Sequence, residues 1–224
     1  MLRFNKAIVM GILGVGIPAS IQNLLNVTGM TVLNNFTASY GADAVAAMGI
    51  VQKINMVPLQ AALGFSQGIM PLISYSYASK NVSRMKETLF FTVKLTLSFL
   101  VTVSVVYYIG AGFLTSLFMK NAVIVSYGTR LLRGLCLGIP FLCMDFIAVG
   151  VFQACGLGKK ALLFAVLRKI VLEIPALFIL NYLFPLYGLA YSQLTAEVIL
   201  SVAAVIVLRR IFKQLEKEAA PAKA

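Results

Sequence analysis

The sequence predicts an all-α integral membrane protein that forms a bundle of six transmembrane helices. Of its 224 residues, 60% are hydrophobic and only 12% are charged. A water-soluble domain could not bury this much apolar surface in its core. Apolar segments of about 20 residues recur along the whole chain, and this is the length that a helix needs to cross a hydrocarbon core about 30 Å thick. A membrane β-barrel would instead show short segments of alternating polarity.

The formal charge of +12 comes from 19 Lys and Arg against 7 Asp and Glu. In a soluble protein this excess would indicate nucleic acid binding, but here the basic residues gather at the ends of apolar segments, where they set orientation in the bilayer. The expected partner is therefore the lipid bilayer and not nucleic acid. Three cysteines lie in or beside one predicted helix, and the chain has no His. Without metal-ligand or redox spacing, we expect no metal and no cofactor.

The first span is predicted over residues 7–36. Its start, with Arg3 before an apolar run, superficially resembles a signal peptide, but the run continues past residue 18 without a persuasive cleavage site. At 100° per residue, Asn23, Asn26, Met30 and Asn34 fall on one helical face. Such a face lines a cavity or makes hydrogen bonds to another helix, and the sequence leaves both interpretations open.

The second span is predicted over residues 44–75 and the third over residues 88–109. Within the second, Lys53, Gln60, Gln67 and Ser74 follow one another at intervals of seven, which places them on roughly one stripe. A polar stripe of this kind should face protein or water and not lipid.

The fourth span, residues 133–155, carries one carboxylate. Measured along a helix, Asp145 lies roughly 15 Å from Cys155 and therefore close to the middle of the bilayer. A charge there costs roughly 2.5 to 3.5 kcal/mol on insertion scales, so a functional role is the default interpretation. Phe141 and Phe152 share its helical face. They offer an apolar surface for substrates, although aromatic residues within a span more commonly serve packing.

Two further spans complete the set, over residues 162–184 and 188–208. In the fifth, Lys169 and Glu173 are four residues apart and can neutralise each other, which favours a structural role for Glu173. In the sixth, Glu197 occupies the centre, with Gln193 one turn away on the same face. A second carboxylate at mid-bilayer depth thus joins Asp145.

Six spans place both termini on one side of the membrane. The positive-inside rule assigns that side to the cytoplasm and predicts a multi-pass protein of the cell membrane with a charged cytoplasmic tail over residues 209–224. The basic residues expected inside are Arg3, Lys6, Lys80, Arg84, Lys86, Lys159, Lys160, Arg209 and Arg210, against Lys120, Arg130 and Arg133 outside.

Several stretches resemble the multidrug and toxic compound extrusion (MATE) family. They are GIPASIQ from Gly16, AAMGI from Ala46, GFSQGIMPLISY from Gly64, VFQACGLGK from Val151 and LRK from Leu167. Their order and spacing resemble the carboxy-terminal six-helix lobe of that family, whose full-length members have twelve helices in two lobes around a cleft. The resemblance implies that residues 1–208 form one lobe of an antiporter exporting lipophilic, cationic small molecules in exchange for H⁺ or Na⁺. It also implies an amino-terminal six-helix lobe as partner.

The resemblance assigns a role to Asp145, which matches the family's recurrent carboxylate in the tenth helix of the full protein. Some members also place a Glu in the helix that corresponds to the first span, where this chain offers Gln22, Asn23 and Asn26. That departure puts an identical Na⁺ site in doubt and leaves Na⁺ at Asp145 as one option. The coupling ion is thus expected to be H⁺ or Na⁺.

The leading hypothesis makes Asp145 and Glu197 the ion-coupling residues. Burial disfavours the charged form of a carboxylate and so favours protonation or binding of a cation. In one rival hypothesis, both acids pair with Lys53 and the chain is a non-functional remnant of a transporter. In another, the chain is a lobe of a flippase for a lipid-linked substrate, whose cleft should be distinctly cationic. The sequence shows no nucleophile with a base and no phosphate loop, so we expect no enzyme.

Overall fold

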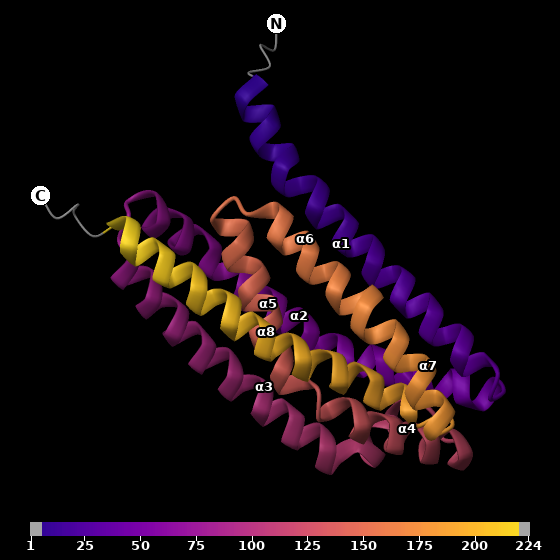
Figure 1. Cartoon of the computed structure of the whole chain (residues 1–224). Coiled ribbons are helices and arrows are strands. Elements are labelled where there is room, and N and C mark those ends of the chain that lie inside the picture. Colours follow the sequence, from indigo (N-terminus) through magenta and orange to yellow (C-terminus); the bar gives the residue numbers. More distant parts are fainter. Residues whose placement is uncertain (1–5, 220–224) are drawn as a thin grey trace, which may run out of the picture.

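The computed structural model describes residues 6–219 and is helical almost throughout (Figure 1). Long helices alternate with tight turns, and one segment is a π-helix. The elements are α1 (Lys6–Ala38), α2 (Ala42–Ala78), α3 (Val82–Phe118), α4 (Ala122–Cys136), α5 (Ile139–Ala154), α6 (Gly158–Val166), η1 (Leu167–Glu173), α7 (Ile174–Leu183) and α8 (Gly188–Ala219).

Helix α5 is the core of the bundle. It packs against α2, α3, α6 and α8, and eleven of its sixteen residues are buried. Its sequence, IPFLCMDFIAVGVFQA, is apolar apart from Asp145 and Gln153, and a helix that is hydrophobic nearly all round lies in a protein core or spans a membrane. Helices α1 and α3 flank the bundle on opposite sides (Figure 1). Asp145 on α5 is therefore held in the interior.

A sharp bend divides the segment that the sequence predicts as one span over 133–155. Helices α4 and α5 meet at 50°, across a break at Leu137 and Gly138. Pro140, in the first turn of α5, has no N–H to continue the hydrogen-bond ladder of α4. Gly138 lies in contact with α8, and a Cβ at this position would be at an ordinary van der Waals distance of 3.5 Å from Leu194 Cα.

The π-helix η1 joins α6 to α7. At its end the Ile174 N–H donates to the carbonyl of Lys169, five residues earlier. Pro175 follows immediately and has no N–H to bond to Val171, so the regular α-helical ladder cannot continue through this turn. π-helical turns are rare and occur frequently at functional sites, and η1 carries Arg168, Lys169 and Glu173.

The outer surface has the character of a membrane protein. Within residues 6–219, three helices are long and apolar enough to cross a bilayer, namely Val9–Ala38 of α1, α2 and α3, and the bent pair of α4 and α5 makes a fourth. The spans expected over 162–184 and 188–208 coincide with the helical run from α6 to α7 and with α8, while their passage through the membrane stays a prediction. Large apolar side chains such as Phe90, Ile109 and Phe113 on α3 are exposed.

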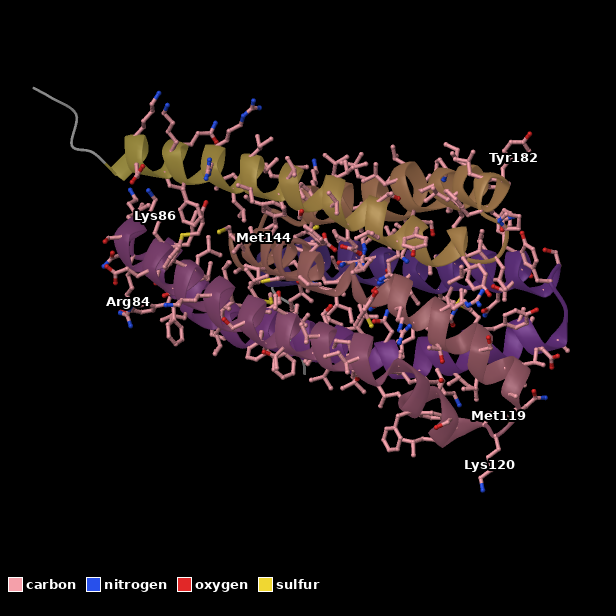
Figure 2. All side chains as sticks on the ribbon, turned by 90° about the horizontal axis from the view of Figure 1, so that it is seen from below. Arg84, Lys86, Met119, Lys120, Met144 and Tyr182 are labelled. Carbon is pink, nitrogen blue, oxygen red and sulfur yellow. The ribbon has the colours of Figure 1, made fainter. Side chains whose placement is uncertain are left out.

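Basic side chains occupy both ends of the bundle. Arg84 and Lys86 lie at one end, and Lys120 lies at the other, where the aromatic Tyr182 is also found (Figure 2). Helix α8 continues beyond the predicted end of its span at residue 208, and its Glu216 forms an ion pair with Lys86 at 2.6 Å. The cytoplasmic position of the termini remains a prediction, and Arg3 and residues 220–224 of the expected tail lie outside the described residues.

The close packing of α2 on α5 depends on Gly150. A Cβ there would collide with Ser66, whose Oγ donates a hydrogen bond of 2.7 Å to the Phe146 carbonyl. Replacing Gly150 with valine should therefore force the helices apart and destabilise the protein by about 1–3 kcal/mol. Thermal unfolding in detergent measures the effect. Gly64→Val is the matched control, because nothing lies within 4 Å of its Cβ position, and equal shifts for the two variants would contradict the prediction.

Candidate functional site: a buried cluster of charged side chains

Three elements bring charged side chains together in the interior. Arg168 on η1 lies between the two carboxylates that the sequence singles out, Asp145 on α5 and Glu197 on α8. Its Nη1 is 3.0 Å from Asp145 Oδ2, and its Nη2 is 2.5 Å from Glu197 Oε1. The side chains of Arg168, Asp145 and Glu197 are only 6%, 3% and 0% exposed. One guanidinium thus bridges two buried acids from different helices.

The ring of Phe146 covers the guanidinium on a further side. Its centroid lies 5.2 Å from Arg168 Cζ, within the range of a cation–π interaction. Phe146 follows Asp145 directly on α5, so the same helical turn supplies a carboxylate and an aromatic face. Arginine suits this position because its planar fork can serve two carboxylates at once while its flat face stacks on a ring.

A second buried ion pair lies on η1. Lys169 Nζ is 2.7 Å from Glu173 Oε1, which confirms the predicted pairing of these two residues. The alkyl chain of Lys169 lies against the backbone of α1, where Gly29 leaves room for it: a Cβ on Gly29 would be 3.0 Å from Lys169 Cδ. The charged segment η1 is therefore in direct contact with α1.

The acids and bases of the cluster do not balance. Three carboxylates, on Asp145, Glu173 and Glu197, face two cations, on Arg168 and Lys169, so one negative charge is in excess when all five are ionised. Glu197 Oε2 has no hydrogen-bond partner. An uncompensated charge in a low-dielectric interior is costly. The arrangement is therefore suited to take up one further positive charge.

The structure corrects one hypothesis about this cluster. Lys53 does not pair with Asp145 or Glu197, because its side chain is exposed on α2 and Arg168 holds both acids. Sequence reasoning missed Arg168 because it precedes Lys169 and resembles part of a basic anchor at the end of a span. The available signal in the sequence was the distance of Arg168 from the membrane surface. Arg168 lies eight residues after Lys160, about 12 Å along a helix.

The other predicted site residues do not join the cluster. Exposed side chains are Asn23, Met30 and Asn34 on α1, Lys53, Gln60 and Gln67 on α2, and Phe141 on α5, whereas Gln22, Asn26 and Gln193 are half-buried. Gln52 Nε2 donates to Asn34 Oδ1 at 3.3 Å and so connects α2 with α1. Phe152 is fully buried and packs edge-on against Phe164, with ring centroids 5.1 Å apart. The cavity-lining role of this set stays a prediction.

Comparison with solved structures identifies the fold as that of one half of a MATE transporter. The chain superimposes on the Vibrio cholerae MATE transporter VcmN in its bent form with a TM-score of 0.88 and 20% identity, covering 95% of this chain and 49% of that one. An outward-facing multidrug resistance MATE transporter gives a TM-score of 0.91 with 21% identity, over 96% of this chain and 49% of that one. At this identity the likeness establishes the fold alone.

Sequence comparison then shows the particular family. The family model described as MatE matches residues 18–183, and the chain belongs to this family. Multidrug export protein MepA of Staphylococcus saprophyticus is 33% identical over 208 residues, which is 92% of this chain and 46% of the relative. MepA of Staphylococcus haemolyticus is 34% identical over 213 residues, or 94% of this chain and 46% of the relative. The chain thus spans about half the length of these curated relatives.

Proposed function

We propose that this chain is the carboxy-terminal lobe of a secondary active multidrug antiporter of the cell membrane. In this function it exports lipophilic, cationic compounds in exchange for H⁺ or Na⁺, and Asp145 and Glu197 form the coupling site. The observation that carries the proposal is the buried cluster itself, where two carboxylates from separate helices share one guanidinium with one negative charge in excess. Family membership and the likeness to MepA support it.

Coupling needs a link from the cluster to the surface that binds substrate. The cluster is too enclosed to admit a drug, so the ion and the drug do not compete directly for Asp145 or Glu197. A conformational change instead links the two binding events. Lys169 lies against α1 at Gly29, and α1 carries the exposed residues Asn23, Met30 and Asn34. When a cation enters, the ion pairs rearrange and η1 moves against α1. A ligand changes such an equilibrium only through different affinities for its two states.

The other half of the transport path belongs to a partner. Because the curated relatives are about twice as long, we propose that an amino-terminal lobe of six helices faces this chain across a cleft. The cytoplasmic location of both termini belongs to the same proposal. The apolar exterior and the enclosed charge cluster favour transport over catalysis.

Ethidium efflux from whole cells tests the proposal. Cells that express this chain together with an amino-terminal lobe of a MepA relative should extrude ethidium, and cells that express this chain alone should not, because a single lobe forms only one wall of a cleft. Collapsing the proton and sodium gradients separately identifies the coupling ion. Efflux that persists after both gradients are collapsed would exclude an ion-coupled antiporter.

A further inference from the structure

The guanidinium of Arg168 lies where a bound cation would be expected. It touches one oxygen of Asp145 and one oxygen of Glu197, at 3.0 Å and 2.5 Å, and the ring of Phe146 covers it at 5.2 Å. Arginine does not lose its charge in proteins. The position between the two acids therefore stays filled by a positive group that is tethered to η1.

We propose that Arg168 determines the ion selectivity of the cluster: as a tethered cation it excludes Na⁺ from the Asp145–Glu197 pair and leaves the site to accept a single proton. The proposal rests on the coupling role proposed above for these two acids. It concerns binding, however, and can be tested without transport.

The carboxylate oxygens of Asp145 and Glu197 that Arg168 does not contact suit a proton better than a metal ion. A proton needs one carboxylate oxygen, and Glu197 Oε2 is buried without a hydrogen-bond partner. Hard metal cations such as Mg²⁺ and Ca²⁺ take about six or more oxygen ligands. Within residues 6–219, no three Asp, Glu, His or Cys side chains converge closely enough to hold a metal ion. A sodium ion would have to displace the guanidinium and break both of its ion pairs.

Within residues 6–219, Arg168 is the one basic side chain that forms an ion pair with Asp145 or Glu197. Helix α8 contributes Glu197, and η1 contributes Arg168 together with the Lys169–Glu173 pair. From α2 come the hydroxyls of Ser66 and Ser74, which donate to the carbonyls of Phe146 and Ala154.

Towards α3, the neutral thiol of Cys143 on α5 donates to the Val93 carbonyl at 3.7 Å. At the start of α6, Lys159 and Lys160 are exposed. The single excess charge is therefore neutralised most simply by one proton on the Asp145–Glu197 pair.

Two equilibrium measurements on the purified chain in detergent test this selectivity. Infrared titration of the carboxylic acid C=O stretch should show one buried carboxyl group that gains a proton as the pH falls, and Glu197→Gln should abolish this signal. Scintillation proximity with radioactive Na⁺ should show no saturable binding to the unaltered chain. Saturable Na⁺ binding, or the absence of any titrating buried carboxyl, would overturn the proposal.

A double substitution tests the role of the guanidinium while the net charge of the cluster stays the same. Arg168→Gln with Glu197→Gln removes one base and one acid, so the excess of one negative charge is kept while the position beside Asp145 is opened. This variant should gain saturable Na⁺ binding, and a variant that elutes as a folded species without such binding would contradict the role of Arg168.

The matched control is Lys86→Gln with Glu216→Gln, which removes the exposed pair between α3 and α8 and should bind no Na⁺. If the open double variant does not fold, saturable Na⁺ binding to the unaltered chain, or the lack of a titrating buried carboxyl group in it, would still overturn the proposal. A failed efflux assay with proton-selective binding intact would count against the proposed transport function alone.

Discussion

Replacing Arg168 with methionine should destabilise the chain by about 3–5 kcal/mol, the range found when one partner of a buried ion pair is removed. The substitution keeps most of the side-chain volume but leaves Asp145 and Glu197 facing each other without a cation. The excess charge of the cluster then rises from one to two. Denaturant or thermal unfolding of the purified chain in detergent measures the loss.

Two further variants separate this effect from a general loss of arginine. Arg133→Met is the surface control: Arg133 is exposed, where its Nε donates to the Tyr108 carbonyl at 3.3 Å, and its removal should change the free energy of unfolding by at most about 1 kcal/mol.

Converting the whole triad to apolar residues, with Asp145→Leu, Arg168→Met and Glu197→Met, should restore stability, because apolar side chains of similar volume replace buried ion clusters at little cost. Near-normal stability of Arg168→Met alone would show that the two acids are not held as charges.

The fold was largely predictable, because a bilayer imposes a length and a composition on each helix. The predicted span over 7–36 lies within α1, Lys6–Ala38, and the span over 44–75 lies within α2, Ala42–Ala78. The breaks within helices were harder to predict. Pro140 lies in the first turn of a new helix after a 50° bend, whereas Pro58 and Pro71 are accommodated inside α2. Sequence alone does not distinguish these cases, because neighbouring helices determine whether a ladder bends.

The candidate site was predictable in part and for a definite reason. Asp145 and Glu197 stand out because isolated acids at mid-bilayer depth are costly, and their convergence follows from the packing of α8 on α5. Arg168 was missed because its partners lie on other helices, at separations in sequence that periodicity does not reach. The same limit applies to Phe152, whose burial against Phe164 depends on the packing of α6 on α5.

Replacing Asp145 with asparagine in the complete transporter should abolish ion-coupled export and reduce ethidium efflux to the level of cells without the transporter. The substitution removes one acid from a cluster that has one in excess, so the remaining acids and bases balance and the protein should fold. Arg168 keeps its contact with Glu197 at 2.5 Å. The variant therefore resembles the cluster after the cation has entered and cannot return to the other state.

Substitutions at two positions of the triad are thereby expected to separate stability from export. Arg168→Met loses stability, whereas Asp145→Asn keeps it and loses export. Asp43→Asn is the matched control, since Asp43 is an exposed acid in the first turn of α2 and its substitution should leave efflux unchanged. Full efflux by Asp145→Asn at normal expression would remove Asp145 from the coupling mechanism and leave the triad as a structural ion cluster.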